Sequence, residues 1–316
     1  SVSVGAMEST VQSATKAIPI KLTYFFLFIV GFGIAETSRD RIKLNLCLLC
    51  SFLLLTVSQI VASVNLYFCW GSFQNMVYTL INAFTNAIVT AKFVTFMIRR
   101  DDYVKLLQLS CDSLWRPDAT GDEAPVLKQC EKQAKFCVIF FAIFAQITGW
   151  VYITEPIIIN LLNNSTDPKD RVFPFDVWLE VPVYETPFFE ILFFIQSAMT
   201  YHVCILYCCF DNYLAIANIF IAGHFTILRN RLTALYNREV NGSKGNHDRN
   251  RNDLNLVFSE FKGCVRQHQF LIRVVEQVES VYTLMNLASV LIYSIIICLI
   301  GYQLIMVRRR MKNSSS

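Results

Sequence analysis

The chain has 316 residues and a formal net charge of +4. Hydrophobic residues make up 54% of it and charged residues only 16%, which excludes an ordinary soluble globular domain. No basic block lies in an interleaved aromatic patch, so the excess positive charge does not predict nucleic-acid binding.

Residues 1–43 are predicted to form a cytoplasmic N-terminus with one short helix at the membrane interface. The apolar run Leu22–Ala35 is too short to cross a bilayer comfortably, since a crossing needs about 20 apolar residues. A cleaved signal peptide is an alternative, because Gly33–Ala35 resembles a cleavage site. Cleavage would place the following basic residues outside, against the charge rule. Met7 is a candidate start residue.

Five later stretches are long and apolar enough to span a membrane. They are Leu44–Phe68, Phe73–Ile98, Lys135–Leu162, Phe188–Ile221 and Val281–Met306. The sequence therefore predicts an all-α fold, a polytopic membrane helical bundle with five transmembrane helices, the first four of them within residues 44–232. The bilayer is the first partner that this pattern implies.

Lysine and arginine are concentrated in alternate gaps between these stretches. Five precede the first span, none lies in the first gap, and the third gap holds only Lys169 and Arg171. The fourth gap holds nine, from Arg229 to Arg273. Because positive residues mark the cytoplasmic side, the N-terminus is predicted to be cytoplasmic.

The predicted outer loop, residues 163–187, carries two overlapping acceptor motifs for glycosylation, at Asn163 and Asn164. Both fall on the side that the charge rule places outside, so both are predicted glycosylation sites. None of the 11 cysteines lies in this loop, and no cysteine or histidine spacing matches a metal site. The sequence predicts neither a disulfide-stapled loop nor a bound metal.

The fourth and fifth helices are predicted to extend into the cytoplasm. The fourth apolar stretch is too long for one crossing, and Asp211 lies where a helix entering near Phe188 would reach the inner interface. An ionisable group inside the bilayer with a functional role is the alternative interpretation of Asp211. Residues 233–253 are polar and predicted to form a flexible loop. A heptad stripe then begins at Leu254, which predicts one long helix over 254–306 that packs on its own subunit or also contacts neighbouring subunits.

Four local sequences, in this order and with this spacing, carry a family resemblance. They are Phe173–Trp178 followed by Glu185–Pro187, then Asp211 with Gly223–Leu228 and Arg231-Leu232, then Gln267–Phe270, and finally Gly301–Leu304. Together with the predicted topology, they resemble the insect odorant receptors over nearly the whole chain. The resemblance implies a tuning subunit of an odorant-gated cation channel, which binds a small volatile odorant and assembles with an odorant co-receptor. It also implies the cell membrane of an olfactory neuron dendrite as the location.

Members of this family have seven spans, and the seventh lines the pore. Five are predicted here, and five crossings from inside would place Arg308–Arg310 outside, contrary to the charge rule. We therefore expect residues 307–316 to be an aberrant tail of a version truncated after Met306. A gustatory receptor of the same architecture, a G-protein-coupled receptor with its N-terminus outside, and a transporter fragment are the alternatives.

No catalytic motif such as HExxH, GxSxG or a P-loop is present in the spans, so neither an enzyme nor a cofactor is predicted. A volatile ligand instead needs an apolar cavity with a few hydrogen-bonding groups. Polar and aromatic residues that share helix faces in the outer halves of the second, third and fourth spans are the predicted ligand-binding residues: Tyr78, Asn82, Thr85, Gln146, Trp150, Phe194, Ser197 and Tyr201. Hydrogen bonding between helices and an interfacial aromatic belt are the alternative roles of these side chains.

Overall fold

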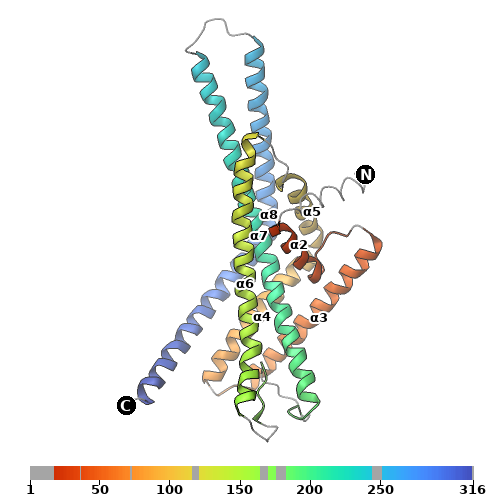
Figure 1. The fold of residues 1–316 in the computed structure, drawn as a ribbon, viewed down its shortest axis with the longest axis vertical. Helices are drawn as coiled ribbons and strands as arrows, with labels where there is room; N and C mark the ends of the chain where they lie inside the picture. Colours follow the sequence, from red (N-terminus) through yellow and green to blue (C-terminus); the bar gives the residue numbers. More distant parts are fainter. Residues whose placement is uncertain are drawn as a thin grey trace. The chain divides into compact units, whose positions relative to one another are not determined.

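The computed structural model describes residues 18–35, 37–71, 73–115, 121–163, 170–175, 183–243 and 251–314, and among them it contains helices but no strand (Figure 1). The α-helices are α2 (Ile18–Val30), α3 (Ser38–Phe68), α4 (Phe73–Ile98), α5 (Arg100–Leu109), α6 (Ala124–Asn163), α7 (Phe188–Ser243) and α8 (Arg251–Ser314). A π-helical turn, Ser110–Leu114, and a 3-10 turn, Gly121–Glu123, complete the described helices. The predicted all-α class is confirmed.

Five of these helices, namely α3, α4, α6, α7 and α8, are long and apolar enough to cross a membrane, and α2 is a shorter apolar helix. Apart from α4, whose bounds match the prediction, these five helices extend beyond the apolar stretches that predicted them. For example, α6 begins at Ala124 rather than Lys135, and α8 continues past Met306 to Ser314. Hydropathy locates only the apolar part of a helix, whereas Lys, Glu, Gln and Arg continue it into polar sequence because they are good helix formers.

The predicted cytoplasmic loop, residues 233–253, and the predicted glycosylation sites, Asn163 and Asn164, are only partly covered by the described residues. Residues 233–243, predicted as part of a flexible loop, continue α7, and residues 244–250 lie outside the described part of the chain. Asn163 is the last residue of α6, and Asn164 lies outside the described residues. Glycosylation at either position stays a prediction.

The chain divides into two compact units, to which α6, α7 and α8 each contribute. The first unit takes Asp101–Ile139 and Asp211–Val281 together with the N-terminal residues up to Phe25. The second takes Phe26–Arg100, Phe140–Phe210 and Tyr282–Ser316. Each unit has its own buried aromatic cluster.

An aromatic cluster forms the core of the second unit. Phe96 of α4 stacks on Phe210 of α7, with ring centroids 4.1 Å apart and an interplanar angle of 7°. Phe32, which follows α2, contacts Phe93 and Phe210 edge to face at 5.6 Å each, and Tyr282 of α8 contacts Phe96 at 5.4 Å. All five side chains are fully buried. Phe32 thereby fixes the residues just after α2 to α4 and α7 of this unit, and α8 joins the cluster through Phe96.

The first unit is built around Tyr213 of α7. Its ring contacts Tyr103 at 5.2 Å and Trp115 at 6.2 Å, and its hydroxyl lies 3.1 Å from Ser110 Oγ. Nε2 of His224, about three turns further along the buried face of α7, lies 3.1 Å from the Leu114 carbonyl oxygen. These contacts attach the π-helical turn and the residue after it to α7.

Gly223 of α7 lies against α6 so closely that an alanine there would place its Cβ 2.4 Å from Cys130 Sγ. We expect Gly223→Ala to lower the free energy of unfolding by about 1–3 kcal/mol, the usual effect of overpacking a core. Because the obstacle is one small side chain, adding Cys130→Ala should restore most of that stability in a double-mutant cycle followed by thermal unfolding. Gly263→Ala in α8 is the control, since no heavy atom lies within 4 Å of its added Cβ. An equal effect at both glycines would exclude the contact as the cause.

Candidate functional site

The second unit contains a partly open cavity of about 410 Å³ between α3, α4, α6, α7 and the non-helical segment 172–175. This volume lies within the range of about 300–1,000 Å³ that is usual for small-molecule sites. Residues at helical spacing form each wall, because side chains three, four and seven positions apart share a face. On α4 this face carries Tyr78, Thr79, Asn82, Thr85 and Asn86.

Most other wall residues are apolar or small. Val61 and Ala62 come from α3, Pro156 and Ile159 from α6, and Met199, Val203 and Cys204 from α7. The polar groups of the walls are concentrated in hydrogen-bonded pairs that join helices. Tyr152 Oη of α6 donates to Asn82 Oδ1 at 2.9 Å, and Asn86 Nδ2 donates to Ser58 Oγ of α3 at 3.0 Å.

Each of these two bonds uses only one end of an asparagine side chain. Among the described residues, Asn82 Nδ2 and Asn86 Oδ1 make no hydrogen bond. The α4 wall therefore offers one amide donor and one carbonyl acceptor to a molecule in the cavity. In apolar surroundings such unpaired groups favour a ligand with a complementary polar atom, because leaving them desolvated and unpaired is unfavourable.

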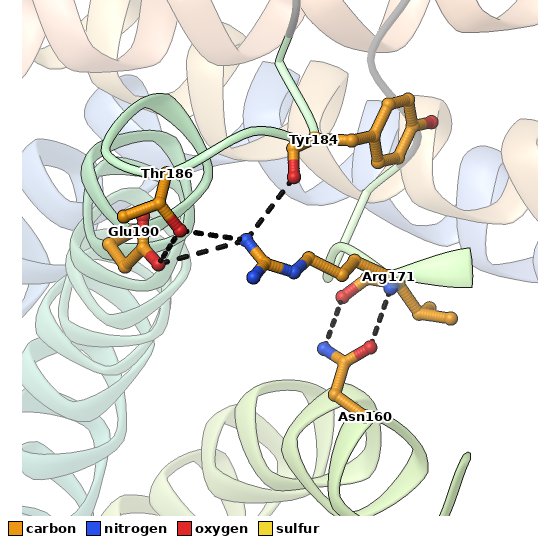
Figure 2. Close-up of polar contacts among 6 residues, drawn as sticks. Asn160, Arg171, Tyr184, Thr186 and Glu190 are labelled. Atoms are coloured by element: carbon orange, nitrogen blue, oxygen red, sulfur yellow. Dashed lines mark hydrogen bonds and ion pairs between the residues drawn. The ribbon is translucent and has the colours of Figure 1, made fainter. Parts of the chain in front are cut away.

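The segment 171–175 is attached to the surrounding helices by side chains rather than by backbone pairing, and Figure 2 shows the first part of this network. Asn160 of α6 accepts a hydrogen bond from Val172 N at 2.7 Å and donates one to Val172 O at 2.9 Å. Arg171 Nη1 donates to Tyr184 O and to Thr186 Oγ1, each at 3.2 Å, and lies 3.7 Å from Glu190 Oε1. Arg171 thus ties the segment to the beginning of α7.

The other end of this segment is held by α7. Gln196 Oε1 accepts from Phe175 N and Gln196 Nε2 donates to Phe175 O, both at 3.0 Å. The Phe175 ring stacks on Tyr152 with centroids 6.1 Å apart, and the Phe173 ring packs on Phe189 at 4.7 Å. Gln196 and Phe173 are buried, so the segment forms a packed wall of the cavity.

Three of the eight sequence-predicted ligand-binding residues line this cavity, namely Tyr78, Asn82 and Thr85. The other five are absent from its wall. Trp150 and Phe194 are 60% and 74% exposed and Tyr201 is also exposed, while Gln146 and Ser197 are half-buried. In their place α6 contributes Thr148 and Tyr152, and α7 contributes Gln196 and Thr200, which lie on adjacent faces of the same helices.

A second cavity, of about 690 Å³, lies in the first unit and has a different chemical character. Its wall includes two ion pairs, Glu123 with Arg231 and Arg238 with Glu260, the latter with 3.2 Å between Nη1 and Oε2. Arg231 also donates to Gln267 Oε1 at 3.0 Å. Charged groups that already pair with each other suit a structural contact better than a volatile ligand.

Comparison with known proteins agrees with the helical architecture. A family model described as the 7tm odorant receptor matches residues 72–313, which is more than half of the chain. Odorant receptor Or2 of Anopheles gambiae is 20% identical over 240 residues, or 74% of this chain. This chain covers 59% of the length of that relative.

Two solved structures have a similar fold. The olfactory receptor OR5 of the insect Machilis hrabei superposes with a TM-score of 0.64, and its complex with eugenol with a TM-score of 0.67. In both comparisons the sequence identity is 16%, and the match covers 90% of this chain and 70% of the other. These similarities establish the fold, and the proteins are receptors rather than enzymes. On the match of its residues 72–313, this chain belongs to the 7tm odorant receptor family of multi-pass membrane proteins.

Proposed function

We propose that this chain is the tuning subunit of an odorant-gated cation channel and that it binds small volatile molecules in the cavity of the second unit. The observation that carries this proposal is the cavity itself, which combines an apolar lining with unpaired amide groups on α4. The OR5 receptor of similar fold has been solved in complex with eugenol, which supports a small aromatic volatile as a ligand class. Among the described residues that line this cavity, Glu155 of α6 is charged, whereas the cavity of the first unit carries two ion pairs.

The wall chemistry favours a ligand with an apolar body and at least one oxygen atom. Asn82 Nδ2 can donate to an ether, carbonyl or hydroxyl oxygen, and Asn86 Oδ1 can accept from a hydroxyl group. A pure hydrocarbon would leave both groups unpaired. Discrimination between oxygen-bearing volatiles and hydrocarbons therefore depends on the α4 wall. The shape of the cavity and its apolar contacts set the affinity that both ligand classes share.

Membership of the family supports a proposal for the partner and the cellular location of this chain. The working receptor would combine this subunit with an odorant co-receptor in the cell membrane of olfactory neuron dendrites, with a cytoplasmic N-terminus. Co-expression with a co-receptor, followed by recording of odorant-evoked cation current, tests the channel role. An N-terminal epitope that antibodies reach only after cell permeabilisation would support the orientation, and labelling of intact cells would contradict it.

Direct binding is the first test of the site. The chain in lipid nanodiscs would be titrated with eugenol and a panel of oxygen-bearing volatiles and hydrocarbons, with empty nanodiscs as the reference for partition into lipid. Saturable binding at one molecule per chain is the expected result. Uptake indistinguishable from that of empty nanodiscs across the panel would contradict the proposal.

Asn82→Leu should weaken binding of oxygen-bearing volatiles about tenfold, because it removes the amide donor from the wall. Hydrocarbons of the same size should change by no more than about twofold, since they never used that group. Asn75→Leu is the matched control, because Asn75 is exposed on the same helix and is absent from the cavity wall. Equal losses for both ligand classes would show that the substitution changes only the shape of the cavity.

A further inference from the structure

The wall of the cavity in the second unit is acidic. Among the described residues that line it, Glu155 of α6 is the only Asp, Glu, Lys, Arg or His. The described wall therefore has a formal charge of −1, with no basic side chain to offset it. Glu155 makes no ion pair within the described part of the chain. A wall of this kind attracts a positively charged molecule and repels an anion.

Glu155 lies in the part of the wall that also carries the polar groups of α4. Tyr152 precedes Glu155 by three residues on α6, so the two side chains share a face of the helix, and both line the cavity. The Tyr152 hydroxyl donates to Asn82 of α4. Glu155 is exposed and the cavity is partly open, so a charged group can reach the carboxylate without losing all of its water. That access limits the desolvation penalty of bringing a charge into the cavity.

Aromatic rings are the second feature of this wall. Tyr78, Tyr152, Phe173 and Phe175 all line the cavity. The rings of Tyr152 and Phe175 stack on each other with centroids 6.1 Å apart. Aromatic faces attract organic ammonium ions, because their electron-rich surface replaces part of the water around the cation. A carboxylate adds a charge-assisted hydrogen bond to an ammonium N–H group. This wall combines both kinds of group.

We propose that Glu155 makes the cavity selective for small amines that carry a positive charge, in preference to neutral molecules of the same size. The ammonium group donates to the Glu155 carboxylate, while the apolar body of the amine contacts residues such as Met199 and Val203 of α7. The inference rests on the proposed function for the site, and it extends the ligand class beyond neutral oxygen-bearing volatiles. Glu155 discriminates by charge, whereas Asn82 discriminates by neutral polar atoms.

A set of probes of nearly equal size separates charge from shape. Phenethylamine is a cation near neutral pH, phenethyl alcohol carries a neutral hydroxyl group at the same position, and propylbenzene carries a methyl group there. Each would be titrated into the full chain in phosphatidylcholine nanodiscs, with empty nanodiscs as the reference for partition into lipid. Glu155→Gln keeps the size of the side chain and removes its charge. Glu155→Asp keeps the charge and shortens the side chain.

We expect Glu155→Gln to weaken binding of phenethylamine about fivefold, the upper range for an ion pair exposed to water. Affinity for the alcohol and for propylbenzene should change by less than about twofold, because neither molecule has a charge that pairs with the carboxylate. Their unchanged binding also shows that the variant is folded. Glu155→Asp should keep the preference for the amine.

Glu185→Gln is the matched control. Glu185 is an exposed residue of the same unit and is absent from the cavity wall. Its replacement removes the same charge from the chain, so the affinities for all the probes should stay unchanged. An equal loss of amine binding in Glu185→Gln and Glu155→Gln would assign the effect to the general charge of the surface and overturn the proposal.

Other outcomes separate this inference from the proposed function. Unchanged binding of phenethylamine by Glu155→Gln, with the alcohol still bound by both chains, would overturn the charge selectivity and leave the proposed function standing. Failure of every probe to bind saturably to the unmodified chain would reject the proposed function and the inference with it.

The choline head group of a lipid is a competing source of an ammonium ion. The titrations would therefore be repeated in phosphatidylglycerol nanodiscs, which contain no choline. The loss caused by Glu155→Gln should have the same size in both lipids if a free amine is the ligand. A loss that occurs in phosphatidylglycerol and disappears in phosphatidylcholine would show that choline occupies the site, and it would overturn the proposal for a free amine.

Discussion

Replacing Gly31 with alanine is expected to lower the free energy of unfolding by about 3 kcal/mol, the sum of backbone strain and overpacking. Gly31 has a φ of +98°, a region that residues with a Cβ rarely adopt. Its added Cβ would also lie 2.6 Å from Leu44 O and 2.7 Å from Leu48 N of α3. Both atoms belong to the backbone of a helix, so no side-chain rotation can relieve the contact.

The strain at Gly31 would act on the core of the second unit. The residue that follows is Phe32, whose ring lies in the aromatic cluster with Phe93, Phe96 and Phe210. Moving residue 31 away from α3 would draw this ring out of the cluster. Thermal unfolding of the purified chain should show a midpoint lowered by roughly 5–10 °C.

Gly71 provides a control with the same backbone requirement and no close neighbour. Its φ is +104°, and no heavy atom lies within 4 Å of an added Cβ. Gly71→Ala should therefore lower the free energy of unfolding only by the backbone strain, about 1–2 kcal/mol. The difference between the two variants measures the close approach of Gly31 to α3. If both lower the midpoint equally, that approach has no energetic importance.

The sequence predicted the helices well because hydrophobic length is a strong signal in a membrane protein. The bounds of α4 agree with the predicted span, since Gly71 and the charged pair Arg99-Arg100 limit its apolar stretch on both sides. The ends of α6, α7 and α8 were less predictable. There the apolar stretch ends but helix-forming polar residues continue, and hydropathy is insensitive to that continuation.

The cavity wall on α4 was predictable because Tyr78, Asn82 and Thr85 recur at helical spacing and therefore share one face. On α6 and α7 the same reasoning selected neighbouring faces, with Trp150 and Phe194 as prominent members. Both are highly exposed, and a lipid-facing surface is as rich in large apolar side chains as a helix contact. A single sequence therefore does not distinguish the face that meets lipid from the face that meets a cavity.

The segment beside the cavity illustrates a second limit. Residues 171–175 were predicted to lie in an outer loop, and no contact of this segment with the helices was predicted. Asn160 and Gln196 bond backbone groups 12 and 21 residues away in the sequence, and such contacts carry no periodic signal. Any asparagine or glutamine near a span end could make them. The contacts of both amides with this segment are evident only once the fold has brought α6 and α7 to the same cavity.

Filling the cavity is expected to have the largest effect on ligand binding. Thr200 of α7 lines the cavity, and within the described part of the chain its hydroxyl bonds only to Gln196 O of its own helix, at 2.8 Å. Thr200→Trp would place an indole ring in a space of about 410 Å³. Because a ligand must then compete with a covalently attached ring, affinity for volatiles should fall by about a hundredfold or more, equivalent to roughly 3 kcal/mol.

Ala198→Trp separates this steric effect from a general response of α7 to tryptophan. Ala198 lies two residues before Thr200, is exposed and is absent from the cavity wall, so its variant should bind volatiles like the unmodified chain. Thermal unfolding of both variants checks that each is folded before titration. If Thr200→Trp is folded and still binds the same volatiles with unchanged affinity, the ligand lies elsewhere and the proposed site must be abandoned. Loss of binding in Thr200→Trp alone would assign the ligand to the space between α4, α6 and α7, because the two variants differ only in the face of α7 that carries the ring.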